Sequence, residues 1–315
     1  MSGPTILPWA DGIARAATLI ADGQVVAVPT ETVYGLAADA TNAAAVACIY
    51  AAKGRPRFNP LIVHVLDMAA AERLAVFDAD ARALAAAFWP GPLTLVLPVR
   101  DRAGLAPAVT AGLPTVAIRV PAGRAMRALL TAGGTPLAAP SANRSGAISP
   151  TTAAHVAASL GSAVPMILDD GACPAGVEST IVAGRKVLRP GPITSCDVES
   201  ALLPGEGRGP VATHPDIGPE MVQAPGQLAS HYAPGKPLRL NAVTAEPDEW
   251  LIGFGPITGD DTLSATGDLT EAAARLFAAL HRADASSKPR IAVAPIPADG
   301  IGEAINDRLR RAAHR

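Results

Sequence analysis

Residues 43–65 of this 315-residue chain read AAAVACIYAAKGRPRFNPLIVHV. The alanine-rich part, 43–52, predicts a helix, because alanine has the highest helix propensity. That helix runs directly into the basic turn Lys53-Gly54-Arg55-Pro56, and the apolar run Leu61–Val65 then predicts a buried strand. This succession indicates an α/β protein with cations at the junction between two elements.

Further strands and helices on both sides of this stretch predict a mixed α/β domain. Helices are expected at 11–21, 68–74 and 80–88. Strands are expected at 25–28, 93–99, 116–120, 137–139, 166–168, 179–183 and 187–188. Because many of these strands follow one another without a helix between them, the pattern excludes a simple doubly wound sheet.

The residue composition of the sequence changes near Leu203. Residues 204–226 are dense in glycine and proline with little apolar periodicity, which is typical of a linker. After them, expected strands alternate with expected helices, which predicts a small Rossmann-like domain: strands at 237–241, 250–254 and 290–295, helices at 270–281 and 302–313. We therefore predict a domain at 1–203, a linker at 204–235 and a second domain at 236–315.

Composition excludes several classes of protein. With 49% hydrophobic and 17% charged residues the chain is foldable, and it has no uncharged apolar run of the roughly 18 residues that span a bilayer. Its first ten residues lack the basic start and apolar centre of a signal peptide, so a cytoplasmic protein with no membrane partner is expected. A formal charge of −2 argues against a surface that coats nucleic acid.

The spacing of the cysteines and the absence of several catalytic motifs narrow the possible kinds of site. Cys48, Cys173 and Cys196 are odd in number and form no C-x-x-C pair, so neither a disulfide framework nor a zinc site is predicted. The sequence also contains no G-x-x-x-x-G-K-[ST], no H-E-x-x-H and no G-x-S-x-G. A nucleotide, if one is bound, must be held by other loops.

The basic turn is the first candidate for such a loop. Lys53, Arg55 and Arg57 lie within five residues, Gly54 permits close approach, and prolines 56 and 60 fix the backbone. Only four of the 26 basic residues are lysine, which singles out Lys53 as a compact point charge. A lysine plus arginine donors in a held loop suit a triphosphate, whereas the alternative is a solvated basic turn.

Two more candidates accompany strands. Residues 29–36, PTETVYGL, place hydroxyls and a carboxylate in a loop after a buried strand, although a capping turn is an equal alternative. Arg119 is the only charge in the strand 115–120, where a substrate carboxylate or an internal Asp or Glu must pair with it. His64 lies in an apolar strand, where histidine is usually a core residue, but Pro60 brings it near the same cleft.

A serine-rich loop is the fourth candidate. Residues 139–150, APSANRSGAISP, offer hydroxyl, amide and guanidinium donors beside a glycine. Downstream, GVESTIV at 176–182 and VLRPG at 187–191 add a serine and a strand-end arginine. Asp169-Asp170 is interpreted as an exposed acidic turn, and no metal ligand is predicted.

Together these segments resemble the L-threonylcarbamoyladenylate synthases of the YrdC-like family. The motifs P-T-E-T-V-Y-G-L, K-G-R-P, S-A-N-x-S-G-x-x-S-P-T, G-x-E-S-T-I-V and L-R-P-G occur in the family's order between about residues 12 and 191. Residues 225–234, PGQLASHYAP, resemble the linker of the long two-domain form, and residues 267–273 resemble its C-terminal domain. The linker lacks a basic residue that the family often carries at 227–230, so its closure is expected to rely less on linker charge.

The resemblance implies a fold and a reaction. The fold would be a YrdC-like mixed twisted sheet with helices around a basic cleft, plus a small Rossmann-like C-terminal α/β domain. The reaction would join L-threonine, bicarbonate and ATP, with Mg²⁺ on the phosphates, into threonylcarbamoyladenylate and pyrophosphate. The product would pass to a tRNA threonylcarbamoyl transferase complex that modifies tRNA beside the anticodon, and direct tRNA binding is left open.

The resemblance also implies site residues. Lys53 and Arg55 would be catalytic, and threonine would be surrounded by Thr32, His64, Arg119, Ala139 through its backbone, and Ser179. ATP would contact Arg55, Asn59, Thr115, Ser141, Asn143, Ser149, Arg189 and Tyr232. Tyr232, in the linker, would close over the site and exclude water. Two other functions stay open: an RNA-binding or regulatory module, and a carbamoyl-transfer enzyme that uses carbamoyl phosphate.

Overall fold

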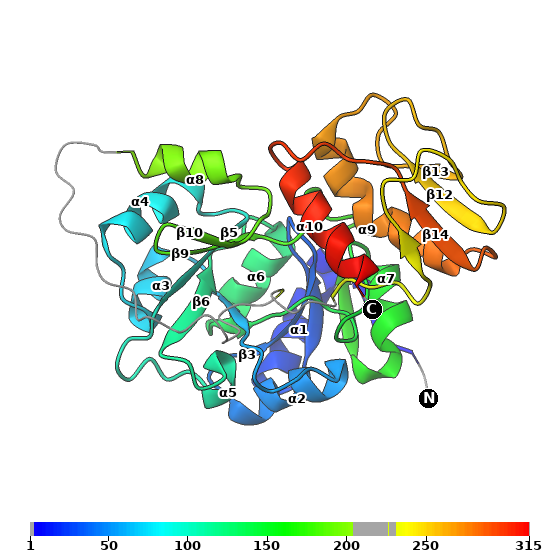
Figure 1. Cartoon of the computed structure of the whole chain (residues 1–315). Helices are drawn as coiled ribbons and strands as arrows, with labels where there is room; N and C mark the ends of the chain where they lie inside the picture. Colours follow the sequence, from blue (N-terminus) through cyan, green and yellow to red (C-terminus); the bar gives the residue numbers. More distant parts are fainter. Residues whose placement is uncertain (1–2, 204–225, 227–230, 315) are drawn as a thin grey trace.

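The computed structural model describes residues 3–203, 226 and 231–314, which form a larger body and a smaller one (Figure 1). The larger body contains every described element up to residue 201, and the smaller one those from 238 onward. The predicted linker, 204–235, lies outside the described residues except for Gly226 and residues 231–235. Among the described residues, no helix is both long and apolar enough to cross a membrane.

The larger body is built on a mixed sheet, as predicted. In the described residues ten strands pair in the order β1-β8-β2-β3-β7-β4-β6-β5-β9-β10. The pairs β1–β8, β2–β8, β4–β6 and β5–β9 are parallel and the others antiparallel. The strands are β1 (Thr5–Pro8), β2 (Val26–Pro29), β3 (Tyr34–Asp39), β4 (Ile62–His64), β5 (Leu93–Pro98), β6 (Thr115–Arg119), β7 (Leu137–Ala138), β8 (Met166–Asp169), β9 (Thr180–Ala183) and β10 (Lys186–Arg189).

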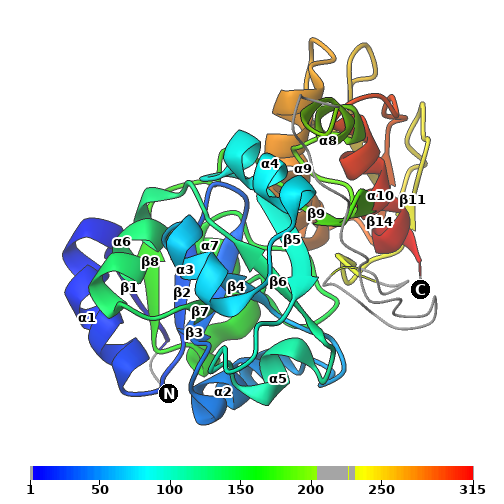
Figure 2. The ribbon, with the colours of Figure 1, turned by 90° about the vertical axis from the view of Figure 1, so that its left-hand side faces the viewer.

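Helices cover both faces of this sheet. Val26 and Val28 of β2 pack against α1 and α6, whereas Ala27 belongs to the cluster that contains α2 and α7, because successive strand residues face opposite sides. Figure 2 shows α1 and α6 together on one side of the sheet. The helices are α1 (Trp9–Ala21), α2 (Ala43–Lys53), α3 (Met68–Leu74), α4 (Ala79–Phe88), α5 (Pro107–Thr110), α6 (Arg124–Gly133), α7 (Ala153–Leu160) and α8 (Ser195–Ala201).

The boundaries of α2 explain why the basic turn starts where it does. The Asn42 side chain accepts from the backbone N–H groups of Ala44 and Ala45, which caps the first turn. Gly54 ends the helix in the left-handed region at φ 62°, a conformation that glycine adopts without strain. Lys53 is therefore the last helical residue, and Arg55 is the first residue of the chain that turns back toward β4.

The smaller body is a parallel α/β unit, as predicted. Its strands β11 (Leu238–Arg239), β12 (Glu249–Gly253), β13 (Asp261–Thr262) and β14 (Arg290–Val293) pair in the order β11-β14-β12-β13, all parallel. Helices α9 (Leu269–Ala285) and α10 (Gly302–Ala313) pack on this sheet. The same apolar cluster includes Val33, Ile148 and Val177 of the larger body, so the two bodies share a core.

Several sequence-based expectations about elements were wrong. Residues 29–36 were expected to form a loop, but Tyr34 begins β3, which pairs antiparallel with β2. Gly35 made this strand hard to predict, because glycine is rare in strands. In the structure, the missing side chain lets β3 lie close to Ala139. No element was expected at β1, α5, α6, α7, α8 or β13. The capping box of Thr194 and Asp197 is a sequence signal that could have revealed α8.

Candidate active site

A pocket lies beside the middle strands of the larger sheet. His64 and Arg119, the last residues of the parallel strands β4 and β6, are partners in register, and residues that follow β2 and β7 also line the pocket. The cavity volume is about 40 Å³, small beside the roughly 300–1,000 Å³ of typical ligand sites. Its lining consists of Thr30, Thr32, Val33, Gly35, Arg55, Ile62, His64, Arg119, Ala139, Pro140, Ser141, Glu178, Ser179, Arg189, Gly226, His231 and Tyr232.

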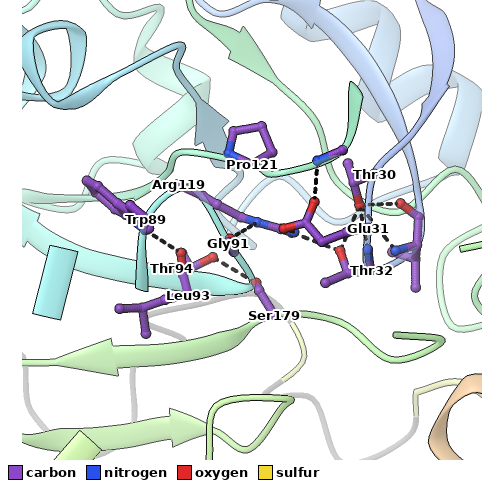
Figure 3. A network of polar contacts seen from close by, with 12 residues as sticks. Thr30, Glu31, Thr32, Trp89, Gly91, Leu93, Thr94, Arg119, Pro121 and Ser179 are labelled. Carbon is purple, nitrogen blue, oxygen red and sulfur yellow. Dashed lines mark hydrogen bonds and ion pairs between the residues drawn. The ribbon is translucent and has the colours of Figure 1, made fainter. Parts of the chain in front are cut away.

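Arg119 is the centre of a buried polar network (Figure 3). Its guanidinium donates to Glu31 Oε1 at 2.6 Å, to Thr32 Oγ1 at 2.9 Å and to the Gly91 carbonyl at 3.1 Å. Burial alone would raise the pKa of the Glu31 carboxyl, but Arg119 lowers it overall. Of the two partners left open by the sequence, the internal carboxylate is present, and Arg119 still lines the pocket beside it.

His64 lies beside Arg119 in the register of β4 and β6. It is 3% exposed, and its Nδ1 has no hydrogen-bond partner among the described residues. Burial, together with the nearby Arg119, lowers its pKa to about 3, so the imidazole is neutral near pH 7. A neutral histidine that lines a pocket with an unpaired nitrogen can bind a polar substrate group.

Lys53 lies behind the serine-rich loop and does not line the pocket. Its ammonium donates to the carbonyls of Ser141 and Asn143, both at 2.5 Å, and its own carbonyl accepts from the Ser145 N–H at 2.8 Å. Burial holds the pKa of Lys53 well below its usual range, and Arg55 lowers it further. The lysine thus anchors the loop whose Ser141 does line the pocket.

Arg55 lines the pocket and is held in place by its own turn. It donates to Asn59 Oδ1 at 2.6 Å, to the Asn59 carbonyl at 3.2 Å and to the Pro60 carbonyl at 2.8 Å. The Tyr50 hydroxyl also donates to the Asn59 carbonyl. Burial lowers the pKa of Arg55 to about 10, which leaves it a cation at neutral pH. Asn59 therefore positions Arg55 and is not itself in the lining.

The remaining predicted residues divide into lining and supporting groups. Ser179 shares a 2.7 Å hydrogen bond with Thr94, and its hydroxyl and carbonyl both accept from Arg189. Ser149 donates to Glu178 at 2.5 Å rather than facing the pocket. Outside the lining also lie Thr115, a buried strand residue, and Asn143, whose amide donates to the Arg144 and Ala147 carbonyls.

Tyr232 lines the pocket and is 1% exposed. The guanidinium carbon of Arg308 lies 5.2 Å from the centroid of its ring, and the Phe277 ring lies 5.7 Å away on α9. Its hydroxyl has no hydrogen-bond partner among the described residues. A buried hydroxyl that lines a pocket without a partner is available to a ligand.

Sequence reasoning missed several residues of this site, His231 of the lining among them. Glu31 and Glu178 were quoted within motifs but given no role, although a buried carboxylate beside arginines is a recognisable pairing signal. Arg308 was missed entirely, because nothing in its local sequence distinguishes it from the exposed arginines around it.

The arrangement suits an anionic substrate. Buried guanidiniums of Arg55, Arg119 and Arg189 converge on the pocket, and among the described residues the carboxylates of Glu31 and Glu178 lie beside them. The described lining contains no cysteine. In residues 3–203, 226 and 231–314, no three His, Cys, Asp or Glu side chains gather into a metal site. Fold and site together define a mixed α/β protein with a buried cationic pocket that suits an anion.

Comparisons with known proteins agree with this description and refine it. Residues 18–191 match the Sua5, YciO and YrdC family described as telomere recombination, and residues 193–314 match the threonylcarbamoyl-AMP synthase C-terminal domain. The chain is 41% identical to a threonylcarbamoyl-AMP synthase of Bacillus subtilis, over 96% of this chain and 92% of that one. A relative of the same name from Pyrococcus abyssi is 37% identical, with 95% and 93% covered.

A solved structure gives the same result at the level of the fold. The crystal structure of Pyrococcus abyssi Sua5 complexed with L-threonine has a TM-score of 0.84 and 34% identity, and covers 99% of this chain and 97% of that one. The chain belongs to the threonylcarbamoyl-AMP synthase family. This confirms the family, the two-part fold and the enzyme class, a nucleotidyltransferase, that the sequence predicted.

The buried histidines make a prediction about stability. Burial lowers the pKa values of His64 and His231 to about 3 from 6.5, so below pH 6.5 the unfolded chain binds more protons than the folded one. Stability should therefore fall as pH drops from 7 to 5. Replacing His64 with glutamine should reduce that slope by about 1.4 kcal/mol per pH unit, measured by urea unfolding. The exposed His314→Gln is the control, and an unchanged slope in His64→Gln would contradict the assignment.

Proposed function

We propose that this chain joins L-threonine, bicarbonate and ATP into L-threonylcarbamoyladenylate and releases pyrophosphate. The observation that carries the proposal is the convergence of Arg55, Arg119 and Arg189, all buried, on one pocket. Two anionic reactants, a carbamate and a triphosphate, require such a concentration of cations to meet. Family membership and the L-threonine bound to the similar Pyrococcus protein support the same choice.

The proposal divides the pocket into two subsites. Thr32, His64, Arg119 and Ser179 all line the pocket, and we assign them, with the Ala139 backbone, to threonine. Arg119 would hold the threonine carboxylate while Glu31 and Thr32 fix the direction of its guanidinium. Arg55, Ser141, Arg189 and Tyr232 also line the pocket, and we assign them to ATP.

The predicted residues outside the lining act through their neighbours in this proposal. Lys53 and Asn143 hold the serine-rich loop, and Asn59 holds Arg55. Ser149 is bound to Glu178. Thr115 pairs with Pro98 in the sheet beneath the pocket, and its buried hydroxyl has no partner among the described residues.

The chemistry needs positioning and charge rather than a protein nucleophile. The threonine amine and bicarbonate form a carbamate with loss of water, and a carbamate oxygen then attacks the α-phosphorus of ATP. The bond from that phosphorus to the bridging oxygen breaks, and pyrophosphate leaves. Arginines that screen both anions and align them supply the acceleration, as in other phosphoryl-group reactions.

Magnesium enters this proposal with ATP as part of the substrate. Among the described lining residues Glu178 is the one carboxylate, and both of its oxygens are already bound by Ser149 and Arg308. Such a set does not suit a resident metal held by the protein alone. Mg²⁺ instead commonly keeps several waters and binds substrate phosphates.

The proposed product also defines a partner. A threonylcarbamoyl group joined to AMP is a mixed anhydride, which water hydrolyses, so a following enzyme must take it up promptly. In this proposal a tRNA threonylcarbamoyl transferase receives it for the modification of tRNA beside the anticodon.

The proposal predicts that pyrophosphate release depends on all three substrates. Release should be fast with ATP, L-threonine and bicarbonate together, and should fall to background when threonine or bicarbonate is left out. Serine in place of threonine removes one methyl group, which is worth about 1–3 kcal/mol in a fitted pocket. Pyrophosphate release that is independent of bicarbonate would contradict carbamate formation.

A further inference from the structure

A buried arginine on α10, the last helix, contacts a residue that lines the pocket of the larger body. Arg308 of α10 is 0% exposed. Its Nε donates to Glu178 Oε2 at 2.9 Å, and its Nη1 donates to Asp307 Oδ2 at 2.9 Å. A fully buried arginine is retained only where its charge is paired, and here the pairing joins the smaller body to the larger one.

Glu178 connects Arg308 to the pocket. It lines the cavity, and its second oxygen, Oε1, accepts from the Ser149 hydroxyl at 2.5 Å. The Ser149 carbonyl is within 3.1 Å of His281 Nε2 on α9. The resemblance to the family implies that Ser149 lies on the nucleotide side. Its hydroxyl is bound to Glu178, the partner of Arg308, and its carbonyl is close to His281 of the smaller body.

Arg308 also contacts Tyr232, the residue that we expect to cover the pocket. Its guanidinium stands 5.2 Å from the centroid of the Tyr232 ring, a separation at which a cation is attracted to the ring face. Phe277 packs beside the same ring at 5.7 Å. Both contacts come from helices of the smaller body, so the position of Tyr232 over the pocket depends on that body.

Charge gives the pairing a further consequence. Without Arg308, the Glu178 carboxylate would face the pocket with Arg189 as its remaining neighbouring cation, and it would oppose a bound phosphate. With Arg308 in place, the charge of the Glu178 carboxylate is paired, and it opposes a bound phosphate less. The pair therefore matters more to an anionic ligand than to the amino-acid substrate.

We propose that Arg308 is a positioning residue that completes the nucleotide subsite from the C-terminal domain. It neutralises Glu178, holds Ser149 through it, and supports the Tyr232 ring. This inference rests on the proposed function, because it concerns the ATP side of that reaction. It assigns the C-terminal domain a part in ATP binding.

The test compares Arg308→Met, Arg308→Lys and a matched control, Arg310→Met, which changes an exposed arginine on the same helix. Michaelis constants for ATP and for L-threonine are measured by pyrophosphate release, with thermal unfolding alongside. Arg308→Met should raise the KM for ATP about tenfold or more and leave the KM for threonine within about twofold. Arg308→Lys should recover part of the loss, and Arg310→Met should match the wild type.

A fourth variant separates positioning from folding. Glu178→Gln in the Arg308→Met background removes the unpaired carboxylate, so the double variant should have a lower KM for ATP than Arg308→Met alone. Equal rises in both KM values, an unchanged KM for ATP, or failure of all Arg308 variants to fold would overturn the inference. A wild-type chain that forms no adenylate would instead refute the proposed function, so the two failures are distinguishable.

Discussion

Replacing Arg55 or Lys53 with alanine is expected to reduce threonine- and bicarbonate-dependent pyrophosphate release by about a hundredfold or more, the size of effect seen when a preorganised hydrogen-bond donor is removed. Arg55 lines the pocket, so its loss removes a charge that the substrate meets directly. Lys53 acts indirectly, through the serine-rich loop. Without its ammonium, the carbonyls of Ser141 and Asn143 lose their hydrogen-bond donor, and the loop is no longer held in place.

The same turn provides the control. Arg57 is exposed, whereas Lys53 and Arg55 are buried, so Arg57→Ala should keep turnover within about twofold of the wild type. Circular dichroism should show that all three variants are folded. Full turnover in both Lys53→Ala and Arg55→Ala would remove the basis of the site assignment.

Replacing Tyr232 with alanine is expected to lower adenylate accumulation far more than ATP binding. The ring fills space between Arg308, Phe277 and the cavity, so its removal opens the pocket to water. Water decomposes both the carbamate and the mixed anhydride, and accumulation should fall about tenfold or more while the dissociation constant of ATP changes about threefold or less. Product is measured by chromatography and ATP binding by calorimetry.

Two further measurements make this second prediction discriminating. Tyr232→Ala also leaves a cavity worth about 3–5 kcal/mol of stability, so assays belong well below its unfolding temperature. Tyr232→Phe keeps the ring and loses only the unpaired hydroxyl. If the ring acts by covering the pocket, Tyr232→Phe should retain most of the adenylate accumulation. Equal losses of binding and accumulation in Tyr232→Ala would refute a covering role.

Local sequence predicted those parts of the fold that local interactions determine. The helix 43–52, the basic turn and the strand 61–65 correspond to α2, its glycine cap and β4 almost residue for residue. Alanine content, an Asn cap and an apolar run suffice there, since each acts within a few residues. The expected strand-end positions of Thr32, Arg119, Ser141 and Arg189 likewise bring them to one pocket.

The partners of these residues could not be predicted in the same way. Lys53 reaches carbonyls 88 and 90 residues away, and Arg119 pairs with Glu31 across 88 residues. Arg308 meets Glu178 across 130 residues and from the other body. Such contacts depend on how the sheet and the second body are assembled, which no local pattern encodes. This is why Lys53 is predicted as a phosphate ligand from sequence and lies behind a loop in the structure.

The central claim, synthesis of threonylcarbamoyladenylate, is tested most directly by mass spectrometry of the wild-type chain incubated with ATP, L-threonine and ¹³C-labelled bicarbonate. We predict a product that contains AMP, threonine and one labelled carbon, with an equal amount of pyrophosphate. Leaving out threonine should abolish it. AMP and pyrophosphate with no labelled adduct, under conditions in which authentic adduct survives, would contradict the account.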